Sequence, residues 1–115
     1  MKIEDIAKVS HEVNAAFCLA FGDYSQAPWE YAAKWQKESS INGVKFHIDN
    51  PKALPSHSHD SWLKEKEKNG WTYGEIKNYD KKTHPCMVPF EDLTDQQKAK
   101  DYIFRQIVHS LINIS

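Results

Sequence analysis

Apolar residues recur every three or four positions in the first 22 residues of the chain, and this helical period constrains the fold more than any other feature. Four of these residues fall on one side of a helix: Ile6, Val9, Val13 and Phe17. Gly22 follows them, as is typical of the end of a helix. The sequence therefore predicts an amphipathic helix that ends at Gly22.

A second strong helical signal lies near the other end of the chain. Thr94 and Gln97 have the spacing of a capping box, in which each side chain bonds to the backbone N–H of the other residue. Ile103, Ile107 and Leu111 then repeat every four positions. These features predict a helix that begins just after Thr94.

Another helix is expected after the first turn. Pro28 suits a first helical turn, because its fixed φ matches helical geometry and its missing N–H is not needed there. This helix would carry Trp29 and Ala32 on one side and end by Gly43. Residues 43–49 fit either another helical turn or a short extended piece, because the stretch is short and its apolar residues alternate.

Ser56 is in position to cap a further helix that runs to Lys68, with Gly70 just past its end. We interpret the charged run KEKEK as the solvated face of this helix. Residues 69–93 then show no helical period, although loops longer than about 12–15 residues are uncommon in compact domains. The segment is too apolar for a disordered tether, so we expect a packed aromatic loop or a short β-hairpin.

The 115 residues suffice for one core and are too few for two, so residues 1–115 are expected to form a single, mainly α domain of about four helices. A net charge of −1 gives no general field that would favour a nucleic-acid polymer or an anionic membrane surface. No apolar run is long enough to cross a membrane, and the first residues lack the apolar stretch of a signal peptide. We expect a cytoplasmic protein.

Metal binding and catalysis find little support in the sequence. His57 and His59 would point about 200° apart on a helix, so they cannot share one ion there, and His84 and Cys86 complete no zinc pattern. Neither Cys18 nor Cys86 has an adjacent base, and both are expected to be reduced thiols. We therefore expect no metal, no cofactor and no enzymatic activity.

Several short motifs follow one another in the second half of the chain. They are H-x-x-W at residues 59–62, G-W-x-Y-G at 70–74, K-x-H-P-C-x-V-P at 82–89, and Leu93. In this order they resemble the ryanodine receptor (RyR) domain family, which occurs as tandem repeats in calcium-release channels and as single domains in bacterial and phage proteins. The stretches HEVNAAFCLAFGD and KWQKESSINGVKFHI resemble the small stand-alone members. The resemblance divides the chain into an N-terminal helical part, 1–50, and a core motif, 56–112.

This resemblance implies a small helical unit that is not an enzyme. In the channels a tandem pair of repeats binds an adenine nucleotide with its bases stacked on Trp, and Trp62 matches that residue. Prokaryotic versions are proposed sensors of nucleotide ligands in defence systems. The resemblance thus implies a non-enzymatic binding module for an adenine nucleotide or a nucleotide-derived signal, either a sensor or a phage-type sequestering protein.

The residue types fit such a ligand, since a base needs an aromatic face and phosphates need cations or N–H groups. Trp62 is the candidate for the base, and His59 would share its helix face. The candidates for the phosphates are Lys81, Lys82 and His84. Tyr73 could contact either ligand or protein, and the same holds for Trp62, for which core packing is the alternative.

Trp71 is a further candidate for contact with the ligand. The alternative is core packing, because a hydrophobic residue just after a helix-ending glycine usually contacts the helix. A second aromatic face for the base could come from a homodimer, with Trp62 opposite its symmetry mate, or from Trp29 or Trp35 in the same chain. The alternative function is a protein–protein interaction or scaffold domain, with Trp29, Tyr31 and Trp35 as its anchors.

Overall fold

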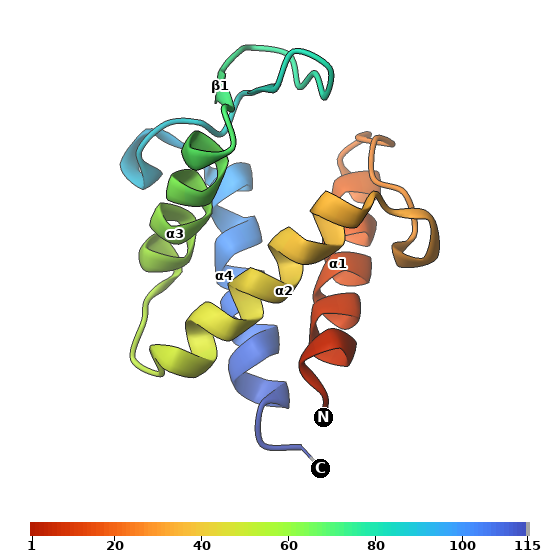
Figure 1. Cartoon of the computed structure of the whole chain (residues 1–115), viewed down its shortest axis with the longest axis vertical. Helices are drawn as coiled ribbons and strands as arrows, with labels where there is room; N and C mark the ends of the chain where they lie inside the picture. The colour runs from red at the N-terminus through yellow and green to blue at the C-terminus, as the bar shows by residue number, and fades with distance from the viewer. Residues whose placement is uncertain (115) are drawn as a thin grey trace.

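The computed structural model describes residues 1–114 and is mainly helical, as predicted. Its four α-helices are α1 (Ile3–Ala20), α2 (Lys34–Asp49), α3 (Pro55–Lys68) and α4 (Asp95–Leu111). Short 3-10 turns lie at Trp29–Tyr31 and Phe90–Asp92. Helices α1 and α4 pack side by side, α2 crosses them, and α3 packs against α2 and α4 (Figure 1).

The core lies where α1, α2 and α4 meet. It consists of five buried residues, two from α1, one from each of α2 and α4, and one from the first 3-10 turn: Ile6, Ala7, Val44, Val108 and Trp29. Burying one such aliphatic side chain contributes about 1.5–3 kcal/mol. This cluster therefore joins three of the four helices. Helix α3 contributes no residue to it and forms one wall of a cavity.

Helix α1 is confirmed, but the predicted apolar stripe was only partly right: Ile6 is buried in the core, whereas Val9 and Val13 are 36% and 39% exposed. The buried face also contains Ser10 and His11. The reason is tertiary: α1 turns small and polar residues toward α2, where Ser40 Oγ donates to the Ala7 carbonyl at 3.2 Å. The helical period was correct, and the neighbours decide which face is buried.

Helix α2 begins later and ends later than predicted. The segment after Pro28 forms only the 3-10 turn, and α2 runs from Lys34 through Gly43 to Asp49. Residues 43–49 are therefore helical, which settles the alternative left open by the sequence. Gly43 does not end the helix, because it is the point where the ring of Phe104 packs on α2: a Cβ added there would lie 2.8 Å from Phe104 Cζ.

Helix α3 begins at Pro55, one residue before the predicted cap Ser56. The backbone N–H of Leu54 donates to His57 Nδ1 at 3.0 Å, so a histidine supplies the capping contact. The helix ends as predicted, with Gly70 at φ +87. The charged run is not wholly solvated, because Lys66 is only 5% exposed.

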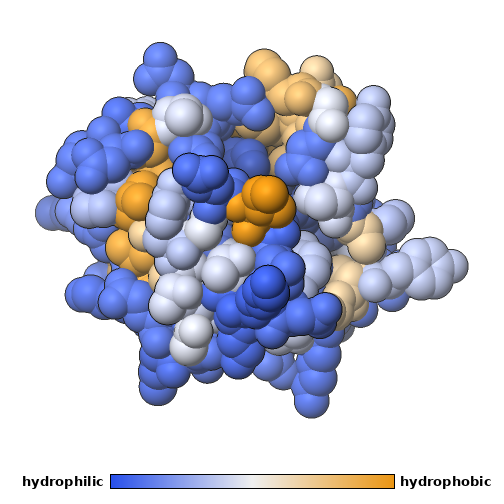
Figure 2. Space-filling model, turned by 90° about the horizontal axis from the view of Figure 1, so that it is seen from above, coloured by the Kyte–Doolittle hydropathy of each residue, from blue (hydrophilic) through white to orange (hydrophobic). Residues whose placement is uncertain are grey.

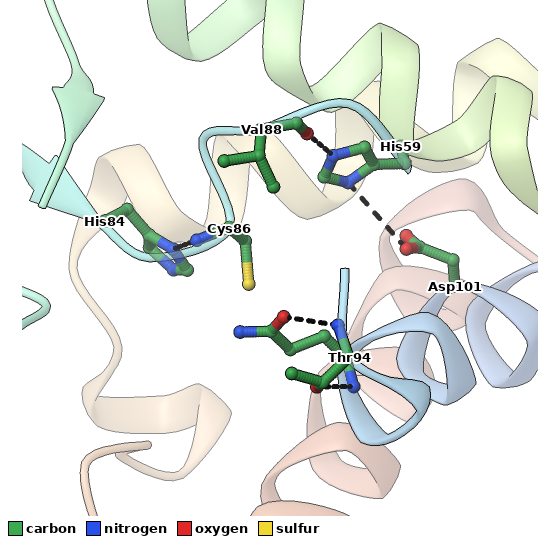
Figure 3. Close-up of polar contacts among 7 residues, drawn as sticks. His59, His84, Cys86, Val88, Thr94 and Asp101 are labelled. Carbon is green, nitrogen blue, oxygen red and sulfur yellow. Dashed lines mark hydrogen bonds and ion pairs between the residues drawn. The ribbon is translucent and has the colours of Figure 1, made fainter. Parts of the chain in front are cut away.

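The capping box of α4 is confirmed. The Gln97 backbone N–H donates to Thr94 Oγ1 at 3.2 Å, and the Thr94 N–H donates to Gln97 Oε1 at 2.9 Å (Figure 3). This reciprocal pair satisfies two donors that a helix start would otherwise leave without partners. It fixes the start of α4 at Asp95, beside the 69–93 segment.

The 69–93 segment contains a short pair of strands, β1 (Thr72–Tyr73) and β2 (Thr83–His84). The strands run parallel, so they are not the two arms of a hairpin, and an isolated antiparallel bridge joins Asn78 to Thr83. The segment lies at one end of the bundle and the two termini lie at the other, where the Met1 amino group donates to the Ile114 carbonyl (Figure 1).

Seen from above, this end of the molecule has separate hydrophobic patches within a mainly hydrophilic surface (Figure 2). Three exposed side chains of the 69–93 segment are Tyr73, Ile76 and Tyr79. Among residues 1–114, no helix combines the length and the apolar character needed to cross a membrane.

Candidate functional site

A cavity of about 670 Å³ lies between the four helices and the 69–93 segment. Sites for small molecules are typically about 300–1,000 Å³, so this volume suits a ligand of ordinary size. Every helix and the segment contribute to its walls, among others through Ser10 of α1, Trp35 of α2, Trp62 of α3, Asp101 of α4 and His84 of the segment. The cavity is the candidate functional site.

One wall of the cavity is aromatic. Trp35 and Trp71 lie with ring centroids 5.5 Å apart, and Trp71 is buried. The ring of His59 stacks on Trp62, at 5.5 Å and 27°, and the ring of His84 meets Trp62 at 5.1 Å and 72°. A flat ligand in the cavity could contact indole rings, but the rings of His59 and His84 already contact Trp62.

Lys66 lies inside this aromatic wall. Its Nζ is 4.7 Å from the ring centroid of Trp35 and 5.7 Å from that of Trp71, within the range of cation–π contacts. Burial lowers the pKa of Lys66, and the neighbouring Glu65, 3.8 Å away, opposes this shift. The ammonium group is thus a partly desolvated cation that lines the cavity.

Glu65 holds α3 against α2. Its Oε2 accepts a hydrogen bond from Ser39 Oγ at 2.7 Å, and its Oε1 accepts one from Asn42 Nδ2 at 2.7 Å. Both oxygens are therefore occupied by α2, and the carboxylate also faces Lys66. These contacts fix the width of the cavity between the two helices.

His84 presents a neutral ring to the cavity. The backbone N–H of Cys86 donates to His84 Nδ1 at 3.0 Å, so the ring proton of the neutral form is on Nε2 (Figure 3). Burial lowers the pKa of His84 to about 3, and the charges of Lys77 and Lys100 act in the same direction. At neutral pH the residue is therefore a hydrogen-bond donor and carries no positive charge.

His59 and Asp101 face each other across α3 and α4 (Figure 3). His59 Nε2 donates to the Val88 carbonyl at 2.7 Å, and its Nδ1 lies 3.8 Å from Asp101 Oδ2. Burial raises the pKa of Asp101 to about 7; Lys100 opposes the shift and Asp60 adds to it. The His59 ring thus links the loop at Val88 to α4.

The predicted phosphate-binding lysines lie elsewhere. Lys81 and Lys82 are exposed and do not line the cavity, and Lys82 Nζ donates to the Asn69 carbonyl at 3.0 Å, at the C-terminal end of α3. Besides Lys66, the cations on the cavity wall are Lys77 and Lys100. Of the lysines at 77, 81 and 82 in the 69–93 segment, only Lys77 lines the cavity.

Two other candidates also lie outside the cavity wall. Trp29 is 7% exposed, with its ring 5.7 Å from His11, so it belongs to the core. This position removes Trp29 both as a second face for a base and as an exposed interface anchor. Tyr73 is 55% exposed and does not line the cavity, whereas Trp35 does.

The cysteines and histidines show no metal-binding arrangement within residues 1–114, where no three His, Cys, Asp or Glu side chains converge. Cys18 and Cys86 are both free thiols. Burial raises the pKa of Cys86, which keeps the thiol protonated and weakens it as a nucleophile.

The fold and the cavity define a small α-helical domain whose second half carries the ordered motifs of the loop. A family model, described as the RyR domain, matches residues 47–114, which is more than half of the chain. The chain belongs to the RyR domain family. The match covers α3, the 69–93 segment and α4, while α1 and most of α2 lie outside it and supply the opposite wall of the cavity.

Most polar residues of the cavity were not predicted as site residues, among them Ser10, Lys66, Lys100 and Asp101. The spacing of Gln97, Lys100, Asp101 and Phe104 on α4 does carry a signal, because steps of three and four place them on one helix face. For Lys66 the signal was misleading, since a lysine in a charged run normally faces solvent. Its burial depends on Trp35, which is 31 residues away in sequence.

Proposed function

We propose that this chain is a non-enzymatic binding module whose central cavity takes an adenine nucleotide or a related nucleotide-derived signal. The observation that carries the proposal is the cavity of about 670 Å³, which combines an aromatic wall with three lysines. Aromatic faces suit a base and cations suit phosphates. Whether the bound nucleotide is sensed or sequestered depends on the cellular context.

The base is assigned to the aromatic wall. Trp62 is the residue that matches the stacking Trp of the RyR domain family, and it lines the cavity together with Trp35 and Trp71. Base-on-aromatic stacking contributes about 1–3 kcal/mol and needs no fixed hydrogen-bond pattern. We assign the principal contact to Trp62.

The phosphates are assigned to Lys77 and Lys100, in place of Lys81 and Lys82. Both lysines line the cavity, and both lower the pKa of His84, which places their charges near that ring. The neutral His84 can donate an Nε2 proton to a phosphate oxygen. The pKa of His84 is low, so the ring would become a cation at neutral pH only if a bound phosphate raised that pKa.

The site is proposed to be complete within one chain. Trp35 lies on the same cavity as Trp62 and can supply the second aromatic surface, which Trp29 in the core cannot. The homodimer, with Trp62 opposite its symmetry mate, remains the alternative. Affinity that rises with protein concentration would favour the dimer, because only a dimeric site depends on assembly.

A thermal-shift screen of mono-, di-, tri- and cyclic nucleotides tests the proposal. Ligand at 100 times its dissociation constant adds about 2.7 kcal/mol to the free energy of unfolding. In a domain of this size that raises Tm by roughly 10 °C. Trp62→Ala should reduce the shift.

Two matched double variants test the phosphate assignment. K77Q/K100Q and K81Q/K82Q remove the same charge, but only the first pair lies on the cavity wall. The first is expected to weaken nucleotide binding strongly and the second only slightly. Equal losses in the two variants would contradict the assignment, and no Tm shift with any nucleotide would contradict the function.

The scaffold alternative loses Trp29 as an anchor, while Tyr31 is 76% exposed and available to a partner. If no nucleotide shifts Tm and a host protein is retained by the wild type but not by Tyr31→Ala, the scaffold function is favoured instead. That result would separate the two functions without further assumptions.

A further inference from the structure

The carboxyl group of Asp101 lies on the cavity wall without a hydrogen bond. Its one polar contact within residues 1–114 is His59 Nδ1 at 3.8 Å, which is too long for a hydrogen bond. The side chain is only 20% exposed, and this burial raises its pKa. A largely buried carboxyl group without a hydrogen bond costs stability. A ligand in the cavity could supply the donor that the chain does not provide.

The neighbouring histidine determines which oxygen is free. The Val88 carbonyl can only accept a hydrogen bond, so His59 Nε2 carries a proton and donates it at 2.7 Å. The lone pair on Nδ1 and the nearby Oδ2 repel each other unless a proton lies on one of them. A proton on Oδ2 of Asp101 removes this repulsion, and the raised pKa of Asp101 favours it. Oδ1 then remains an acceptor without a donor.

We propose that Asp101 determines the specificity of the site by accepting, through Oδ1, a hydrogen bond from an N–H of the ligand, namely the 6-amino group of a purine base. This inference rests on the proposed function, because it specifies which part of the nucleotide meets α4. His59 stacks on Trp62 at 5.5 Å between the ring centroids, and its Nδ1 lies 3.8 Å from Asp101. Trp62 and Asp101 therefore line neighbouring parts of the same cavity, so one ligand can contact both.

The raised pKa of Asp101 also explains how an acidic residue can line a site for an anion. An ionised carboxylate near the phosphates would repel them, whereas a protonated Asp101 carboxyl group can accept a hydrogen bond without adding negative charge. Lys100, next to Asp101 in α4, remains free to attract the phosphate oxygens. The two roles can therefore lie side by side on the same helix.

Calorimetric titration of the full chain with two probes tests the inference. The probes are adenosine 5′-monophosphate and its analogue that lacks the 6-amino group, purine riboside 5′-monophosphate. The wild type is expected to bind the first about tenfold more tightly, the ratio that one hydrogen bond of ordinary strength gives. Asp101→Ala should bind both equally.

Two further variants serve as controls. Asp101→Asn keeps an acceptor oxygen and should keep the preference for the amino group. Asp80→Asn makes the same change at an exposed position outside the cavity wall and should behave as the wild type. Asp101→Ala should melt at or above the wild-type temperature, because it removes a desolvated carboxyl group.

Three results would overturn the inference. Equal binding of the two probes by the wild type would overturn it and leave the proposed function intact. Binding of neither probe would overturn the inference, and it would overturn the proposed function as well only if no nucleotide of the thermal-shift screen raises Tm. A large loss of Tm in Asp101→Ala would show that the residue holds the fold together, which contradicts a role in recognition.

Discussion

His47 illustrates at the residue scale how burial controls the charge of a side chain in this domain. It is fully buried between α2 and α4, and its Nδ1 lies 3.0 Å from His109 Nε2. Its own Nε2 has no hydrogen-bond partner within residues 1–114. Burial lowers the pKa of His47 to about 4, and the charges of His109 and Arg105 act in the same direction.

This shift predicts a loss of stability in acid. The folded-state pKa of about 4 lies below the ordinary value of 6.5, so between these pH values the unfolded chain binds more protons. The contribution of His47 to stability is therefore constant above pH 6.5 and declines as pH falls toward 4. Glutamine does not titrate, so the free energy of unfolding of His47→Gln should rise relative to that of the wild type as pH falls from 6.5 toward 4. Urea denaturation at several pH values measures the difference, and a constant difference would contradict the assignment to His47.

The residues of the site show what local sequence can and cannot predict. Trp62, His59 and His84, which belong to the sequence motifs, all line the cavity. Lys81 and Lys82 were equally plausible from the sequence, yet neither lines the cavity. Lys82 has a positive φ of 54 and lies in a turn of the loop that the sequence did not predict. A sequence reveals the residue types, but a loop conformation decides which of them meet.

At the scale of elements, α2 and α4 make a close contact at Gly43, where the ring of Phe104 packs on the backbone of α2. A Cβ at this position would lie 2.8 Å from Cζ and 3.1 Å from Cε1 of Phe104. Alanine is a better helix former than glycine by about 1 kcal/mol, whereas overpacking a well-packed contact costs about 1–3 kcal/mol. The second effect should exceed the first.

Gly43→Ala is therefore expected to lower the free energy of unfolding by about 1 kcal/mol, measured by urea denaturation. In a Phe104→Leu background the same substitution should become neutral or stabilising, because the ring no longer occupies the space. If Gly43→Ala stabilises the wild type, the close contact between α2 and α4 is not present in solution.

The existence of the four helices was predictable because helical period and capping are local. The capping box at Thr94 and the end at Gly70 were read correctly for this reason. The buried face of α1 was not, because its contacts are tertiary: Ser40 of α2 donates to the Ala7 carbonyl, and His11 packs against Trp29. The parallel pairing of β1 with β2 was likewise hidden, since strands of two residues leave no periodic signal.

At the scale of the whole molecule, the cavity joins residues that no single segment contains. The family match begins at residue 47, whereas Trp35 and Ser10 lie before it and line the same cavity. The first half of the chain therefore completes a site whose motifs lie in the second half. The site could be foreseen in part from those motifs, but its polar wall on α1 and α2 required the tertiary structure.

The four tryptophans report on the central claim most directly, because three line the cavity and one does not. In a two-dimensional ¹H–¹⁵N NMR spectrum each indole N–H gives its own signal, and adenosine nucleotides can be titrated into the sample. We predict that the signals of Trp35, Trp62 and Trp71 shift together with one saturating curve, while that of Trp29 stays in place. No shift at saturating nucleotide, or a shift confined to Trp29, would contradict a ligand site in the central cavity.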